Sequence, residues 1–72
     1  MLISINKVSK LIGKDYRTTI KLVEKFGFTF NGTKYLPIDK TIEFLKWLGY
    51  GEITINKYLK ELVGQWAKEG KV

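Results

Sequence analysis

Glycines divide this chain of 72 residues into short segments, and this punctuation limits what it can fold into. Gly13 and Gly27 each follow an amphipathic stretch, and Gly49 and Gly51 flank a tyrosine. Glycine ends helices readily because it takes the left-handed conformation without strain. A further glycine follows Asn31, and Asn-Gly is a strong signal for a two-residue turn between strands. We therefore expect short helices and one small hairpin.

The first two segments predict a helix-turn-helix over about residues 4–26. Ser4 is placed to cap a helix over about residues 5–12, whose apolar residues follow helical spacing. Asp15 is placed to cap a second helix that runs to about Phe26. Two helices joined by a glycine-containing turn of about three residues form the helix-turn-helix unit. The predicted inner face of the second helix consists of Tyr16, Thr19, Ile20, Val23 and Phe26.

A β-hairpin is predicted over about residues 28–36. Two alternating runs, 28–30 and 33–35, flank the Asn31-Gly32 turn. A two-residue loop places four side chains on one face, paired as Phe30 with Thr33 and Phe28 with Tyr35, and leaves Thr29 and Lys34 on the other. We expect the aromatic face to pack on the helices and the turn to be exposed.

Two further helices are predicted, over about residues 39–48 and 54–68. Pro37 and Asp39 open the first of them, with Ile38, Ile42, Leu45 and Leu48 inward. Thr54 is placed to cap the second, where Ile55, Leu59, Leu62 and Trp66 repeat at helical spacing. This stripe closes the core or forms a dimer seam. Trp47 and Trp66 are expected in the core, and Tyr50 is expected to be exposed.

The fold class predicted is mainly α with a small β-hairpin (α+β). Three to four helices and a two-stranded wing make a winged helix-turn-helix in a single domain over residues 1–72.

Charge is distributed unevenly along the chain. The formal net charge is +6, and residues 1–36 carry seven basic and two acidic side chains. Such asymmetry favours a polyanion partner for the N-terminal half. The alternative is that the lysines serve only solubility.

The sequence lacks the residues that several classes of protein function require. The chain has no cysteine and no histidine, no phosphate-binding glycine loop and no spaced pair of catalytic carboxylates, so we expect neither an enzyme, nor a metal site, nor a cofactor. It has no apolar stretch of membrane-spanning length and no signal peptide pattern. We expect a cytoplasmic protein with no membrane partner.

The outer face of the second helix carries the candidate site. Lys14, Thr18, Lys21 and Lys25 fall on one helical stripe, with Arg17 beside it. The start of this helix reaches base edges in helix-turn-helix proteins, so Arg17 is the candidate for a guanine contact and Thr18 for a base or phosphate contact. The lysines would neutralise phosphates, and Tyr16 would support either the core or the DNA backbone. The alternative is a solvated helix face that includes Glu24.

The hairpin tip offers a second set of contacts, namely Asn31, Thr33 and Lys34. These residues contact DNA phosphates, or else the hairpin only covers the core.

The order of elements resembles the winged helix-turn-helix of the MerR and excisionase superfamily over about residues 3–63. The resemblance lies in Val8-Ser9-Lys10-Leu11-Ile12-Gly13, Arg17-Thr18, Leu22-Val23, Gly27-Phe28, Asn31-Gly32, Tyr35-Leu36-Pro37-Ile38-Asp39, Ile42, Leu45 and the segment 48–63. It implies binding of duplex DNA, often with bending, by a homodimer or a cooperative array. By position it implicates Lys14, Arg17, Thr18, Lys21 and Lys34.

Some features depart from this superfamily. One extra residue lies near Phe26, and the wing is short and poor in arginine. The long dimerisation helix and the effector-binding part of MerR regulators are absent from this sequence, so no small-molecule effector is expected.

Three functions follow as hypotheses. The first is a double-stranded DNA-binding protein: a small transcription regulator, an excisionase-like factor or a nucleoid-associated architectural protein. The second is a protein-interaction adaptor without DNA binding, with Tyr50 and Trp66 at the partner surface. The third is RNA binding, which requires exposed Phe28, Phe30 and Tyr35 for base stacking.

Overall fold

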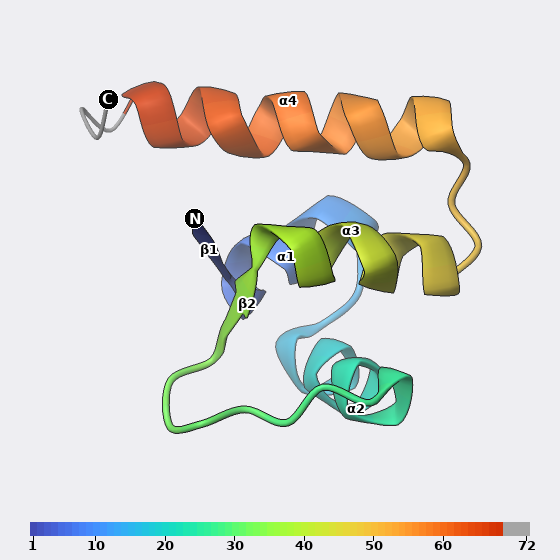
Figure 1. Cartoon of the computed structure of the whole chain (residues 1–72). Helices are drawn as coiled ribbons and strands as arrows, with labels where there is room; N and C mark the ends of the chain where they lie inside the picture. The colour runs from blue at the N-terminus through green and yellow to red at the C-terminus, as the bar shows by residue number, and fades with distance from the viewer. Residues whose placement is uncertain (69–72) are drawn as a thin grey trace.

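The computed structural model describes the backbone of residues 1–68 and the side chains of residues 1–62 and 64. Within this part of the chain, four helices accompany a two-stranded antiparallel sheet, a mainly helical α+β arrangement. In chain order the elements are β1 (Leu2–Ser4), α1 (Ile5–Ile12), α2 (Tyr16–Phe26), β2 (Tyr35–Pro37), α3 (Ile38–Trp47) and α4 (Glu52–Lys68). Figure 1 shows α2 at one end of the molecule and α4 at the opposite end, with α1, α3 and the sheet between them.

The two N-terminal helices form where the sequence predicts them. The Ser4 hydroxyl accepts a hydrogen bond from the Lys7 backbone N–H at 3.3 Å, which satisfies a donor that the first turn of α1 leaves free. Gly13 ends α1 with φ of 71°, and Gly27 ends α2 with φ of 116°. Asp15 occupies the N-cap position of α2. Both helices therefore end at glycines in the left-handed conformation that side chains disfavour.

The sheet differs from the predicted hairpin. The strand β2 pairs with the N-terminal strand β1, with Ile3 opposite Leu36. Both of these side chains are buried, whereas the residues on either side of them point to the other face of the strands and are more exposed. The pairs Phe30–Thr33 and Phe28–Tyr35 do not form, and residues 28–34 make a loop instead. Burial of the Ile3–Leu36 pair favours the long-range partner over the local one.

The side chains of this loop correct two further expectations. The rings of Phe28 and Phe30 lie edge to face, with centroids 5.5 Å apart, and both pack partly against the core. Lys34 was expected on the opposite face from Phe30, but its Nζ lies 5.3 Å from the centroid of that ring. Tyr35 was expected to point inward and is 45% exposed.

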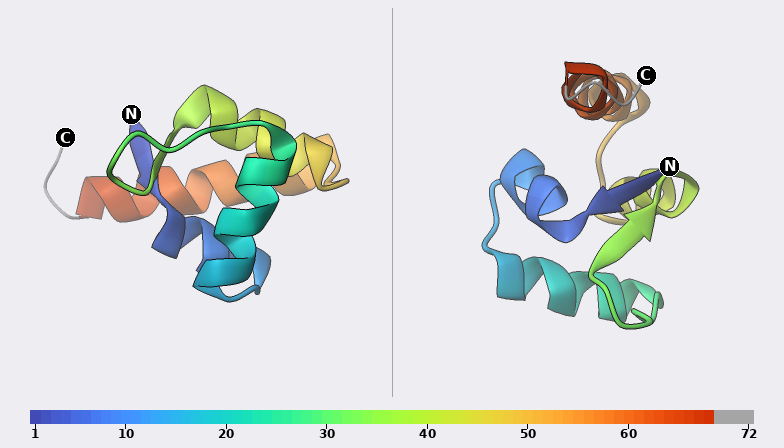
Figure 2. Two further views of the ribbon diagram at one scale, coloured as in Figure 1. Left: turned by 90° about the horizontal axis from the view of Figure 1, so that it is seen from below. Right: turned by 90° about the vertical axis from the view of Figure 1, so that its left-hand side faces the viewer.

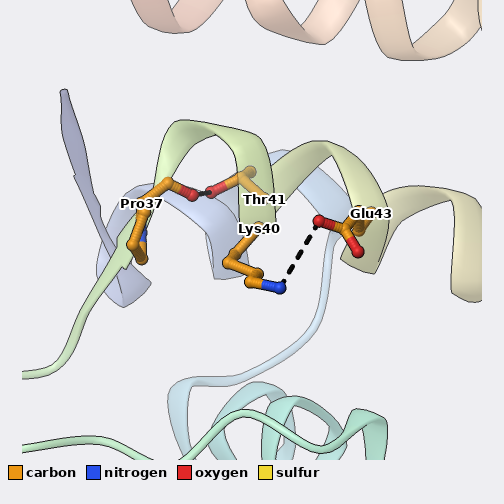
Figure 3. A network of polar contacts seen from close by, with 4 residues as sticks. All are labelled: Pro37, Lys40, Thr41 and Glu43. Atoms are coloured by element: carbon orange, nitrogen blue, oxygen red, sulfur yellow. Dashed lines mark hydrogen bonds and ion pairs between the residues drawn. The ribbon is translucent and has the colours of Figure 1, made fainter.

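The helix α3 supplies a core residue that the sequence pattern did not single out. Phe44 is fully buried, and its ring packs against Phe26 with centroids 5.6 Å apart. Trp47 was expected in the core, but it is 45% exposed and stacks on the outer side of Phe44. The buried Thr41 hydroxyl donates to the Pro37 carbonyl at 3.0 Å (Figure 3).

The helix α4 begins two residues earlier than predicted. It starts at Glu52, so Thr54 lies inside the first turn and is not the cap. Ile55 and Leu62 are buried, which confirms that this helix closes part of the core. Tyr50, expected to be exposed, is half-buried against Tyr58. The side chain of Trp66 lies outside the described residues. No helix in the described part of the chain has the length and apolar character needed to cross a membrane.

Candidate nucleic-acid interface

The helix α2 has one buried face and one basic face. Thr19 and Val23 are fully buried, and at 3.6 residues per turn Lys21 falls on the opposite side of the helix. The predicted stripe is solvent-exposed throughout, as is the arginine beside it: Lys14, Arg17, Thr18, Lys21 and Lys25. Asp15 and Glu24 add two exposed carboxylates to the same segment, so positive charge prevails there without being uniform.

The start of α2 is held by side chains around Asp15. The buried Thr19 hydroxyl donates to the Asp15 carbonyl at 2.9 Å. The Asp15 carboxylate makes no close capping hydrogen bond to the first-turn N–H groups. Even so, the pKa of Asp15 is lowered, mainly by the Thr18 hydroxyl and in smaller part by the backbone N–H groups of Thr18 and Arg17. Thr18 itself is exposed, so the hydroxyl that lowers this pKa is also accessible to solvent.

An open hollow of about 260 Å³ joins the start of α2 to the loop 28–34. It brings Tyr16 together with Thr33 and Lys34, three of the residues predicted from sequence. Tyr16 was also assigned to the inner face of α2, but it is 39% exposed and contributes a wall of this hollow. The hollow thus connects the start of α2, through Tyr16, with two residues of the predicted hairpin tip, while the basic stripe of α2 lies outside it.

Lys34 is fixed at both its backbone and its side chain. Its carbonyl accepts the Ile5 N–H at 3.0 Å, which continues the pairing of β1 with β2. Its ammonium group lies over the face of Phe30, where the ring quadrupole attracts a cation. Lys34 remains exposed overall, so its charge is positioned at the surface rather than neutralised by a carboxylate.

Four residues that line the hollow were not among the predicted DNA contacts, namely Ser4, Ile5, Asn6 and Tyr35. Tyr35 had a usable signal, because alternation along a strand exposes it once Leu36 is inward. Asn6 had no such signal, because it lines the hollow only where the loop 28–34 returns to α1.

Most of the predicted residues do not line this hollow, namely Lys14, Arg17, Thr18, Lys21, Lys25 and Asn31. Asn31 is exposed near the turn at Gly32 but does not line it. Lys25 lies in the last turn of α2, roughly 15 Å along the helix from its start. There its charge also interacts favourably with the helix C-terminus. Figure 2 shows α2 and the loop at the same end of the molecule.

No group of three or more acidic, cysteine or histidine side chains lies together in the described residues as a metal site would require.

No known protein family model, curated protein or solved structure shows significant similarity to this chain.

Proposed function

We propose that this protein binds double-stranded DNA, with α2 in the major groove and the loop 28–34 on the adjacent phosphate backbone. The observation that carries the proposal is that α2, with its exposed basic stripe, and the loop that holds Thr33 and Lys34 lie at the same end of the molecule (Figure 2), where Tyr16 at the start of α2 shares a hollow with both loop residues. In this proposal the loop serves as the wing does in the winged helix-turn-helix proteins of the MerR and excisionase superfamily that the sequence resembles.

The dimensions support this proposal. The major groove of B-DNA is about 12 Å wide and admits one α-helix, whose diameter with side chains is about 10–12 Å. With eleven residues, α2 is about 16 Å long. The apolar side of α2 is anchored on the core through Val23 and Phe26. Only its polar side is free to enter a groove.

Each basic residue has a role in this proposal. Arg17, in the first turn, reaches a guanine edge, because its planar guanidinium forms two parallel hydrogen bonds. Lys14, Lys21 and Lys25 bind phosphates as point charges, and Lys34 binds a phosphate beside the groove. One arginine among many lysines favours modest base specificity, as in a nucleoid-associated or small regulatory protein.

The test is fluorescence anisotropy of a labelled duplex of roughly 25 base pairs, titrated at several salt concentrations. Arg17→Ala/Lys21→Ala is expected to weaken binding and to reduce the salt slope by about one to two units. The matched control is Lys46→Ala/Lys60→Ala, which removes the same charge from exposed positions on α3 and α4. This control is expected to keep the wild-type slope.

Equal losses in the two variants would mean that binding follows net charge and that α2 is not the interface. No binding of wild type at low salt would favour the adaptor hypothesis. A single-stranded RNA of equal length serves as competitor. Stronger competition by that RNA than by unlabelled duplex would assign the surface to RNA, for which only Tyr35 among the three loop-region aromatics is well exposed.

A further inference from the structure

A second basic surface lies between α1 and α4, away from the proposed DNA interface. A groove of about 530 Å³ runs between these two helices, within the size range of ligand pockets, roughly 300–1,000 Å³. Figures 1 and 2 place α4 at the end of the molecule opposite α2. A duplex lying along α2 therefore leaves this groove accessible.

The groove combines lysines with an apolar wall. Lys10 from α1 and Lys57 from α4 are both exposed at its edges, and Lys7 adds a third cation. Leu11 and Tyr58 are half-buried, so each keeps part of its apolar surface open to the groove. Glu61 is the acidic residue among its walls.

We infer that this groove docks an acidic amphipathic helix of a partner protein. Lysines from both helices match acidic side chains on either flank of such a segment, while Leu11 and Tyr58 receive its apolar residues. A second nucleic acid fits less well. A phosphate backbone gains nothing from Leu11 and is repelled by Glu61, whereas a protein segment can offer a donor to that carboxylate.

The inference is independent of the proposed function, because Lys10 and Lys57 are not among the proposed DNA contacts.

The probe is a fluorescein-labelled synthetic peptide of about four helical turns, with leucines along one face and glutamates flanking them. Its control has the same composition with the leucines scattered around the helix. We expect the amphipathic peptide to bind full-length protein at least tenfold more tightly than the scrambled one. In ¹⁵N-labelled protein it is expected to shift amide signals of α1 and α4 rather than those of α2.

Lys10→Glu/Lys57→Glu is expected to weaken peptide binding tenfold or more. The control variant Lys46→Glu/Lys60→Glu, which reverses the same charge outside the groove, is expected to change it less than threefold. Equal binding of both peptides, equal losses in both variants, or signal shifts confined to α2 would each overturn the inference. DNA titrations of the same two variants separate this result from the proposed function, since both should bind DNA to the same extent.

Discussion

At the scale of single residues, three buried hydroxyl groups show how this small core tolerates polar atoms. Each donates to a backbone carbonyl about one helical turn earlier: Ser9 to Asn6 at 2.8 Å, Thr19 to Asp15 at 2.9 Å and Thr41 to Pro37 at 3.0 Å. No buried side-chain nitrogen or oxygen among the described residues lacks a partner. A buried hydroxyl without such a bond would cost on the order of 1–3 kcal/mol.

Thr41 gives the sharpest test of this point, because its hydroxyl donates to the Pro37 carbonyl (Figure 3) and also lies 3.5 Å from the carbonyl of Leu36 in the middle of β2. Thr41→Val keeps the shape of the side chain and removes both bonds. We expect the free energy of unfolding in urea to fall by about 1 kcal/mol. Thr29→Val, at an exposed loop position, is the control and should change it by less than about 0.5 kcal/mol. An unchanged stability of Thr41→Val would show that these bonds contribute nothing net.

Asp15 predicts a pH dependence at the start of α2. Its pKa in the folded protein lies below the ordinary value of 3.8, chiefly because of the Thr18 hydroxyl. A lowered pKa means that the carboxylate stabilises the fold above pH 3.8 and that this contribution is lost as the pH falls through the folded-state value. The melting temperature of wild type should therefore exceed that of Asp15→Asn at neutral pH, and the difference should shrink in acid.

The role of Thr18 in this effect is measured directly by following the Asp15 carboxyl signal in an NMR titration. Thr18→Val is expected to raise the pKa of Asp15 towards 3.8, since it removes the main group that favours the charged form. Identical titration midpoints in the two proteins would contradict this assignment.

At the scale of elements, the loop 28–34 is the part of the chain where a strong local signal did not decide the structure. Gly32 has the positive φ expected of it, 92°, but Asn31 does not have a positive φ, so the two-residue hairpin turn that the Asn-Gly pair predicts does not form. The flanking strands are also absent, because Phe28 and Phe30 pack partly on the core and β2 pairs with β1. A turn signal specifies a local bend and leaves the strand partner open.

Hydrogen exchange distinguishes the two pairings. The Ile5 amide donates to the Lys34 carbonyl at 3.0 Å beside the buried Ile3–Leu36 pair, so it should exchange slowly. The amides of Phe30 and Thr33 belong to no strand and should exchange at rates near those of an unfolded peptide. Protection of Phe30 and Thr33 equal to that of Ile5 would indicate the hairpin instead.

At the scale of the whole molecule, α4 is attached to the core through buried apolar side chains. Leu62 belongs to the same buried cluster as Ile5 and Val8 of α1, and Ile55 is buried near the other end of α4. Beside these residues, α1 and α4 line the basic groove. Among the described side chains of α4, Leu62 is the one in this buried cluster, so its truncation tests how α4 is attached.

Leu62→Ala is expected to lower the free energy of unfolding by about 2–5 kcal/mol, the usual cost of such a core truncation. The control Lys60→Ala, on the exposed side of α4, should change it by less than about 0.5 kcal/mol. Urea unfolding followed by circular dichroism and by tyrosine and tryptophan fluorescence should give coincident transitions. A small effect of Leu62→Ala with separate transitions would mean that α4 unfolds on its own.

Much of the helical part of the fold follows from local sequence. Ser4 with Gly13, and Asp15 with Gly27, mark the bounds of α1 and α2, because caps and glycine stops act on neighbouring backbone groups. The exposure of the basic residues of α2 follows from the same periodicity. Where local signals were weaker, as at Thr54 near the start of α4, the prediction missed by two residues.

The tertiary structure decided what depends on residues distant in the chain. The pairing of β1 with β2 joins segments separated by α1, α2 and a loop, and burial of Ile3 against Leu36 favours it over the local hairpin. The same return of the chain places Lys34 over Phe30 and sets Tyr16, Asn6 and Tyr35 around one hollow. The sequence determined which residues α2 exposes, because helical periodicity is local. Which loop residues lie near α2 depended on the buried contact between Ile3 and Leu36, and no local sequence pattern predicts that contact.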